Sequence, residues 1–161
     1  MISIASATDI LKRPKTMAAM TWVRKLNRES GAWLEFVSAV HFEDDVLQSP
    51  EGLLVRGQWK PSVGVKPSIF VFGLHVGNDR IYAIDVKPSG LHKNSVGIGR
   101  ALFRQTISGI HEHTWSSEGY GYAEPLELVG VAAAWKLFSE KASISGETFF
   151  HPDNGQMGLE L

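Results

Sequence analysis

Residues 68–86, SIFVFGLHVGNDRIYAIDV, contain two runs rich in β-branched and aromatic residues with three turn-forming residues between them. Side chains of these types favour extended strands, and the Gly-Asn-Asp segment allows the chain to reverse tightly. The stretch therefore predicts a β-hairpin, and the rest of the fold can be read outward from it.

Three other segments have alternating or β-rich patterns: 32–42 (AWLEFVSAVHF), 52–60 (GLLVRGQWK) and 109–115 (GIHEHTW). Their connections to the hairpin are short, which favours an antiparallel sheet. Residues 98–107 (IGRALFRQTI) fit a short helix or a further strand, and the pattern does not separate the two.

Two segments have the spacing of helices. In residues 17–27 (MAAMTWVRKLN) the apolar side chains follow a helical stripe, and Thr16 can cap the first turn. Pro125 suits a helix start, and the mostly apolar residues 126–141 after it predict a helix that covers the sheet. The tail, residues 149–161, contains turn signals and a short strand pattern. We predict an α+β fold in which residues 1–161 form a single domain, with an antiparallel β-sheet of about five strands covered by two or three helices.

Composition restricts the class of protein. A chain of 161 residues with 43% hydrophobic residues can bury a core, and its apolar runs fall well short of the ~20 residues of a membrane span. The first residues lack the pattern of a secretory signal, so we expect a cytoplasmic protein without a membrane partner. The absence of cysteine excludes disulfides and thiolate metal sites, so any metal depends on His and carboxylate ligands.

Charge is distributed unevenly although the net charge is −1. Residues 52–110 contain eight basic and two acidic side chains, and residues 111–161 contain two basic and eight acidic ones. This division predicts either a basic face that attracts polyanions and an acidic face elsewhere, or two halves that neutralise each other in the fold.

Residues 109–126, GIHEHTWSSEGYGYAEPL, contain the strongest candidate site. On a strand, His111 and His113 point to the same face with Cα atoms ~6.5 Å apart. They could bind a metal with a third ligand from Glu118, His92 or Asp85.

Two other interpretations of this histidine pair remain open. One is metal-free acid–base catalysis at a phosphate, which needs a cation to hold the anion. The candidate cations are Lys87, Lys93, Arg100 and Arg104. The other is that both histidines are half-exposed strand residues that pack on Trp115.

Loop residues extend the candidate site. Glu118 and Tyr120 follow the predicted strand, and the tyrosine ring could stack on a base or contact a phosphate. His92 and Asn94 could reach the same place if their loop folds back. The isolated histidines His41, His75 and His151 are interpreted as structural. The sequence contains no G-x-x-x-x-G-K-[ST], G-x-G-x-x-G, H-E-x-x-H or G-x-S-x-G motif, which argues against NTPases, dinucleotide enzymes, zincins and nucleophile-elbow hydrolases.

The segment RIYAIDVKPSGLHKN…GIHEHTWSSEGYGYAEPL, residues 80–126, resembles a loose group of small bacterial and phage proteins. The group includes the TumE-type toxins of toxin–antitoxin pairs and several uncharacterised families. In it, a strand ending in Asp leads to a His-rich loop and then to a His-x-His strand with a Glu-Gly-Tyr turn. Lys93 stands where a second adjacent histidine is common. The resemblance implies a site formed by the following residues: Asp85, His92, Asn94, His111, His113 and Glu118.

These observations predict a small protein that acts on nucleic-acid or nucleotide phosphodiesters, in the manner of a nuclease or RNA-binding toxin. The predicted roles are as follows: His111, His113 and Glu118 are catalytic; Lys93, Asn94, Arg100, Arg104 and Tyr120 bind substrate; His92, His111 and His113 are ligands if a divalent metal is present. No cofactor is required by this hypothesis, and an antitoxin is a candidate protein partner.

The alternative belongs to another class. A non-catalytic phage or mobile-element protein could bind and inhibit a host defence complex, as anti-CRISPR proteins do. The acidic last third of the chain would then act as a decoy surface toward a basic partner. An enzyme depends on His111 and His113, whereas a decoy depends on the acidic side chains Glu140, Glu147 and Asp153.

Overall fold

The computed structural model describes residues 1–27, 31–146 and 148–154. The elements in these residues are, in chain order, α1 (Ile4–Lys12), β1 (Lys15–Met17), β2 (Val23–Asn27), β3 (Gly31–Phe42), the 3₁₀ turn η1 (Val46–Gln48), β4 (Leu53–Lys60), β5 (Ile69–Val76), β6 (Asp79–Val86), β7 (Leu91–Lys93), β8 (Thr106–Ser108), β9 (His111–Ser116), β10 (Gly119–Pro125), α2 (Gly130–Lys141), β11 (Ile144–Ser145) and η2 (Pro152–Asn154).

Within the described residues, nine strands form one sheet in the order β10-β9-β6-β5-β4-β3-β1-β11, with β2 also paired to β3. The pairings are antiparallel except that of β1 with β11. The predicted α+β fold with about five strands is therefore wrong: the chain is mostly β, with a larger sheet. The missed strands are short or rich in glycine, and strands of two or three residues have no readable period.

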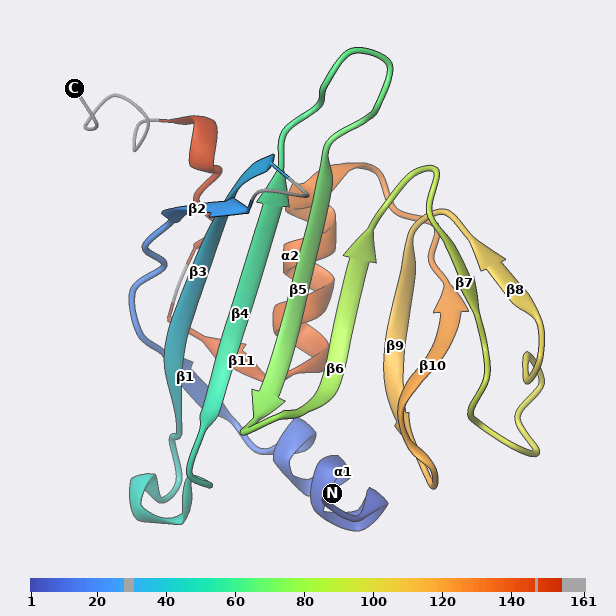
Figure 1. The fold of residues 1–161 in the computed structure, drawn as a ribbon. Coiled ribbons are helices and arrows are strands. Elements are labelled where there is room, and N and C mark those ends of the chain that lie inside the picture. The colour runs from blue at the N-terminus through green and yellow to red at the C-terminus, as the bar shows by residue number, and fades with distance from the viewer. Residues whose placement is uncertain (28–30, 147, 155–161) are drawn as a thin grey trace.

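The predicted hairpin at the centre of the sheet is confirmed as β5 and β6, which pair antiparallel across a tight turn. Helix α2 packs behind these strands, as Figure 1 shows. Aromatic rings carry this contact: the ring centroids of Phe72 and Trp135 are 5.2 Å apart, and the rings of Tyr82 and Phe138 stack at 5.8 Å. Among the described residues no helix covers the opposite face of β4–β6, which we call the open face.

The helix predicted for residues 17–27 is wrong. The end of β1, a connecting segment and β2 occupy this part of the chain, and the backbone N–H of Ala18 donates to the carbonyl of Ala39 on β3 at 2.9 Å. Trp22 packs edge-to-face on Phe36 with ring centroids 4.8 Å apart. Met17, Met20 and Trp22 are thus buried, whereas Val23 and Leu26 on β2 are exposed. Pairing with β3 overrides the helical spacing of these residues.

The other helix predictions need smaller corrections. Pro125 is the last residue of β10, and α2 begins at Gly130. Helix α1 was not predicted, although Ser3 caps it by accepting a hydrogen bond from the Ser6 N–H at 3.0 Å. Residues 98–107 form turns that lead into β8. Most of the strand predicted in the tail falls on residues 155–161, which lie outside the described residues.

A membrane span would need a long apolar helix, and the helices formed by the described residues include none of that kind.

Candidate functional site

Two neighbouring strands place an aspartate beside two histidines. Asp85 on β6 is the register partner of His111 on β9, and His113 pairs with Ala83. Glu112, between the histidines, lies on the other face and accepts a hydrogen bond from the Tyr82 hydroxyl at 2.7 Å. The alternation predicted for this strand is therefore present, and both histidines share the open face with Asp85.

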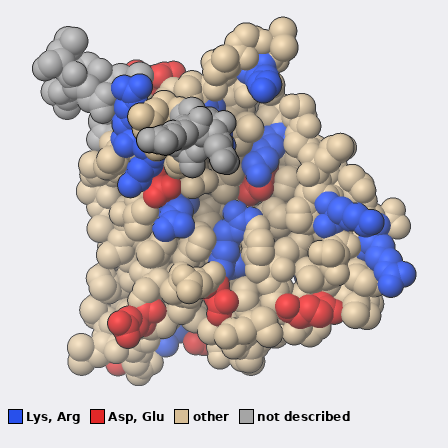
Figure 2. Space-filling view, in the orientation of Figure 1, with Lys and Arg blue, Asp and Glu red and all other residues tan. Residues whose placement is uncertain are grey.

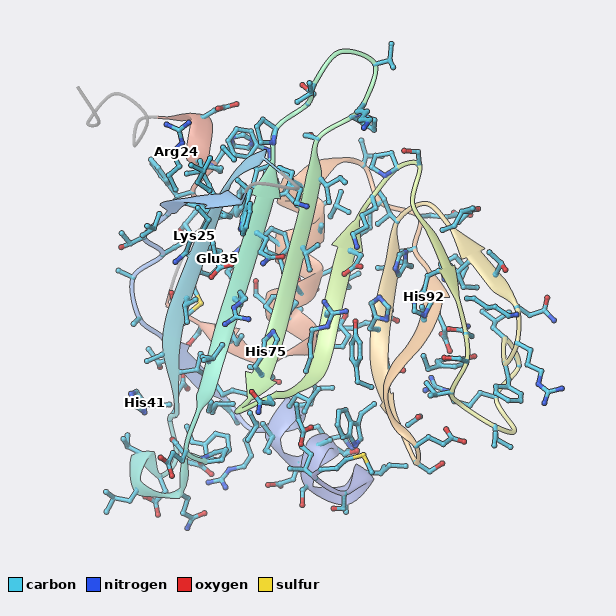
Figure 3. The ribbon with its side chains drawn as sticks, viewed as in Figure 1. Arg24, Lys25, Glu35, His41, His75 and His92 are labelled. Atoms are coloured by element: carbon cyan, nitrogen blue, oxygen red, sulfur yellow. The ribbon has the colours of Figure 1, made fainter. Side chains whose placement is uncertain are left out.

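A third histidine comes from the two-stranded unit of β7 and β8, here called the arm, which lies beside β10 in Figure 1. Asn94 fastens the arm to β10. Its amide group donates to the Ala123 carbonyl at 2.9 Å and accepts from the Ala123 N–H at 2.7 Å, and it also donates to the Leu102 carbonyl at 3.0 Å. His92 consequently lies between β7 and β10, where Figure 3 labels it.

The polar atoms of Asp85, His111 and His113 meet at one point. The Nε2 atoms of the two histidines are 3.1 Å apart, and each is 3.5 Å from Oδ2 of Asp85. Both histidines are 2% exposed and Asp85 is 3% exposed. The expectation of half-exposed histidines packing on Trp115 is therefore wrong.

Backbone carbonyls select the tautomers of two rings. Nδ1 of His111 lies 2.7 Å from the Gly109 carbonyl, and Nε2 of His92 lies 2.7 Å from the Gly121 carbonyl. A carbonyl oxygen only accepts, so these nitrogen atoms donate, and the other nitrogen of each neutral ring carries a lone pair. Histidines that bind metals are held in this way by a hydrogen bond to their second ring nitrogen.

Two cations flank the aspartate. Nζ of Lys87 lies 3.0 Å from Oδ2 of Asp85, and Nη1 of Arg80 lies 3.8 Å from Oδ1. Burial acts to raise the pKa of Asp85, but the close contacts with the two imidazoles and the charges of Arg80 and Lys87 outweigh it and hold the pKa well below its usual range. Burial lowers the pKa of His113, so an ionised carboxylate faces a neutral imidazole.

The arrangement can hold a metal ion. One ring nitrogen from each of His92, His111 and His113 lies within 4.8 Å of the others. Ligands about 2.0–2.1 Å from a tetrahedral ion are ~3.3 Å apart. The separations of 3.1 and 3.5 Å between the histidine nitrogens and Oδ2 of Asp85 bracket this value. His113 differs from the other two rings, because its Nδ1, like Oδ1 of Asp85, is buried without a hydrogen-bond partner among the described residues.

Tyr120 lies at the edge of the histidine cluster. Its ring centroid is 5.3 Å from that of His113. The guanidinium carbon Cζ of Arg80 lies over the same ring, 4.2 Å from the centroid. Tyr120 is 39% exposed, so it forms the boundary between the buried cluster and solvent.

Two predicted site residues have structural partners instead. Asn94 is fully buried and its amide forms hydrogen bonds with backbone groups, while its role in binding substrate stays a prediction. Glu118 accepts hydrogen bonds from the N–H groups of Gly97 at 2.7 Å and Ile98 at 3.2 Å. These bonds lower the pKa of Glu118, and they hold the loop of the arm rather than a histidine.

The three basic residues predicted to bind substrate do not point toward the histidine cluster. Lys93 is exposed, next to His92 on β7, and successive strand residues point to opposite faces. Arg100 contacts Glu124 at 3.2 Å and Thr114 at 2.8 Å, on the face of β9 and β10 that the histidines do not share. Arg104 is exposed in a turn of the arm.

Arg80, which the sequence did not suggest, lies at the cluster because of an irregularity in the sheet. Leu74 pairs with Tyr82, but His75 pairs with Arg80, so Ile81 is an extra residue in β6. In a regular strand, residues five apart face opposite sides. The bulge places Arg80 on the same face as Asp85, and simple alternation gave no signal for it.

Comparison of the chain with protein-family models, with curated protein sequences and with solved structures finds no match. The side chains of the cluster are therefore the basis for inferring a function.

Proposed function

We propose that the protein is a metal-dependent phosphodiesterase that acts on nucleic acid or nucleotides, with a divalent ion held by His92, His111, His113 and Asp85. The observation that carries the proposal is the buried meeting of two imidazole nitrogens and a carboxylate oxygen at 3.1 and 3.5 Å. Nitrogen and oxygen ligands of this kind suit Zn²⁺ and related ions.

Burial favours a metal over metal-free acid–base catalysis. A general acid or base must contact the substrate, but His111 and His113 are 2% exposed and their Nε2 atoms face each other and Asp85. A neutral His113 and an ionised Asp85 are instead protonation states that metal ligation requires. His92 is only partly buried, so the cluster is closest to solvent on the side of His92 and Tyr120.

Neighbouring side chains favour an anionic substrate. A bound divalent ion would polarise a phosphoryl oxygen and lower the pKa of a bound water. Arg80 and Lys87, which flank Asp85, can hold the phosphate oxygens through charge-assisted hydrogen bonds. The exposed ring of Tyr120 offers a flat surface on which a base can stack.

The test is cleavage of labelled RNA and DNA by purified protein, with added Zn²⁺ or Mn²⁺ and with a chelator. We expect cleavage that needs the metal and that is lost in the double variant His111→Ala/His113→Ala. His41→Ala is the matched control, because His41 is exposed on β3 and outside the cluster. Metal binding without cleavage of either nucleic acid would show that the phosphodiesterase assignment is wrong.

The inhibitor hypothesis and the resemblance to TumE-type toxins remain predictions from the sequence. The inhibitor reading makes Glu140 and Asp153 essential and leaves the histidines dispensable, and Glu147 lies outside the described residues. A partner pull-down that loses its signal in Glu140→Gln/Asp153→Asn and keeps it in the histidine variant would favour it over the enzyme.

A further inference from the structure

We propose that a second site, a pocket on the open face between Arg56, His75 and Arg80, binds an oxyanion of the phosphate class. The inference deepens the proposed function, because it gives the substrate a second phosphate-binding position beside the histidine cluster. His75 was interpreted from the sequence as structural, and neither arginine was a predicted site residue.

The pocket is small and polar. Its volume is about 110 Å³, which is the space of a few water molecules at ~30 Å³ each and suits a tetrahedral oxyanion. Its lining residues come from β4, β5 and β6: Arg56, Gln58, Val71, Gly73, His75 and Arg80.

Gly73 keeps the floor of the pocket open. A Cβ atom at this position would lie 2.8 Å from Nε2 of His75 and 3.1 Å from Cδ of Arg80. The backbone of Gly73 does not have a positive φ, so an alanine is allowed by conformation and excluded only by the neighbouring side chains. The glycine therefore lets His75 and Arg80 approach the backbone between them.

Positive charge dominates the pocket. Arg56 and Arg80 both line it, and Figure 2 shows Lys and Arg side chains across the middle of this face. Glu35 offsets part of this charge, since its Oε1 lies 3.9 Å from Nε of Arg56. Burial, and then the charges of the two arginines, lower the pKa of His75 to about 4, so the ring is neutral at pH 7 and can still donate one hydrogen bond.

The pocket and the histidine cluster lie in line across the sheet. Arg56, Gly73, Ala83 and His113 are successive register partners on β4, β5, β6 and β9. Neighbouring strands are ~4.8 Å apart, so Gly73 and His113 are separated by about 10 Å. Arg80 belongs to both places: it lines the pocket, and its Nη1 lies 3.8 Å from Oδ1 of Asp85. A substrate with two phosphate groups can therefore occupy both.

The experiment is titration of the metal-free, chelator-treated protein with inorganic phosphate at constant ionic strength, followed through the ring signals of His75 in NMR spectra. Two variants test the pocket. Arg56→Gln removes a cation and leaves the histidine cluster unchanged, and Gly73→Ala fills the floor against His75 and Arg80. Lys66→Gln is the control, since it removes one exposed positive charge from a loop outside the pocket.

We expect saturable phosphate binding that is weakened at least fivefold in each pocket variant and less than twofold in Lys66→Gln. Absence of binding by the wild-type protein, or equal affinities in all four proteins, would overturn the inference. The double variant His111→Ala/His113→Ala should bind phosphate as the wild type does. Phosphate binding without any nucleic-acid cleavage would therefore support the pocket and reject the phosphodiesterase. Metal-dependent cleavage without phosphate binding would support the phosphodiesterase and reject the pocket.

Discussion

Asp85 and His111 are register partners on neighbouring strands, and their side chains meet on the open face, with Oδ2 of Asp85 3.5 Å from Nε2 of His111. Antiparallel pairing fixes this meeting, because partners directly opposite each other carry their side chains to the same side. The sheet therefore positions a carboxylate and an imidazole before any ion binds, and only His92 depends on the arm.

The charge of Asp85 should contribute to metal affinity. Asp85→Asn keeps the size of the side chain but removes the negative charge next to the ion. We expect the affinity for Zn²⁺, measured by competition with a chromophoric chelator, to fall at least about tenfold. Asp44→Asn is the control, because Asp44 pairs with Arg13 at the surface. Equal affinities for Zn²⁺ in the wild type and Asp85→Asn would contradict the assignment of this carboxylate.

Glu118 should act as a positioning residue. Glu118→Ala removes the acceptor for the N–H groups of Gly97 and Ile98, so we expect faster hydrogen exchange at these two amides and weaker Zn²⁺ binding through a looser arm. Gly97 and Ile98 donate to different oxygens of Glu118, and Glu118→Gln keeps only one acceptor oxygen, so it should restore the protection of one of the two amides. If Glu118→Gln instead abolishes cleavage while protection of both amides is unchanged, the residue is catalytic as the sequence predicted.

Asn94 should stabilise the docking of the arm. Asn94→Ala leaves the N–H and carbonyl of Ala123 without their buried partners, and we expect a loss of about 2–4 kcal/mol in the free energy of unfolding. Urea denaturation measures the loss, and Asn78→Ala in the exposed β5–β6 turn is the control. A loss below about 0.5 kcal/mol would show that water replaces the amide at no cost.

Acid should destabilise the fold partly through His75. Its pKa is lowered from 6.5 to about 4, so between these values the unfolded chain binds more protons than the folded one. This contribution to stability is fully present above pH 6.5 and is lost as the pH falls toward 4. We expect the wild type to lose about 1–2 kcal/mol more than His75→Gln between pH 7 and pH 4, as measured by urea denaturation in phosphate-free buffer. The control His41→Gln should lose as much stability as the wild type. An equal loss of stability in the wild type and His75→Gln would contradict the lowered pKa of His75.

The central strands and the shared face of His111 and His113 could be predicted because both follow from local alternation. Residues 17–27 show where local pattern fails: their apolar spacing fits a helix, but Trp22 is buried against Phe36 from an extended segment. Apolar side chains can be buried from a helix or from an extended segment, so their spacing alone does not choose between the two structures. The long-range pairing with β3 decides in favour of the extended segment.

The remaining parts of the site depend on contacts that no local pattern contains. Glu118 was predicted as a site residue from its loop position, and Asn94 from the family resemblance and a loop that could fold back, yet both form hydrogen bonds to backbone groups of distant segments. The position of Arg80 depends on the extra residue Ile81 in β6. A bulge shifts the face of every residue on one side of it, and its place is set by pairing with β5.

The most direct test of the metal centre is the metal content of the protein after exposure to Zn²⁺ and dialysis, for the wild type, His111→Ala/His113→Ala and His41→Ala. The proposed site predicts one ion per chain in the wild type and in His41→Ala, and none in the double variant. A wild-type protein that retains no Zn²⁺, or a double variant that retains as much as the wild type, would contradict it.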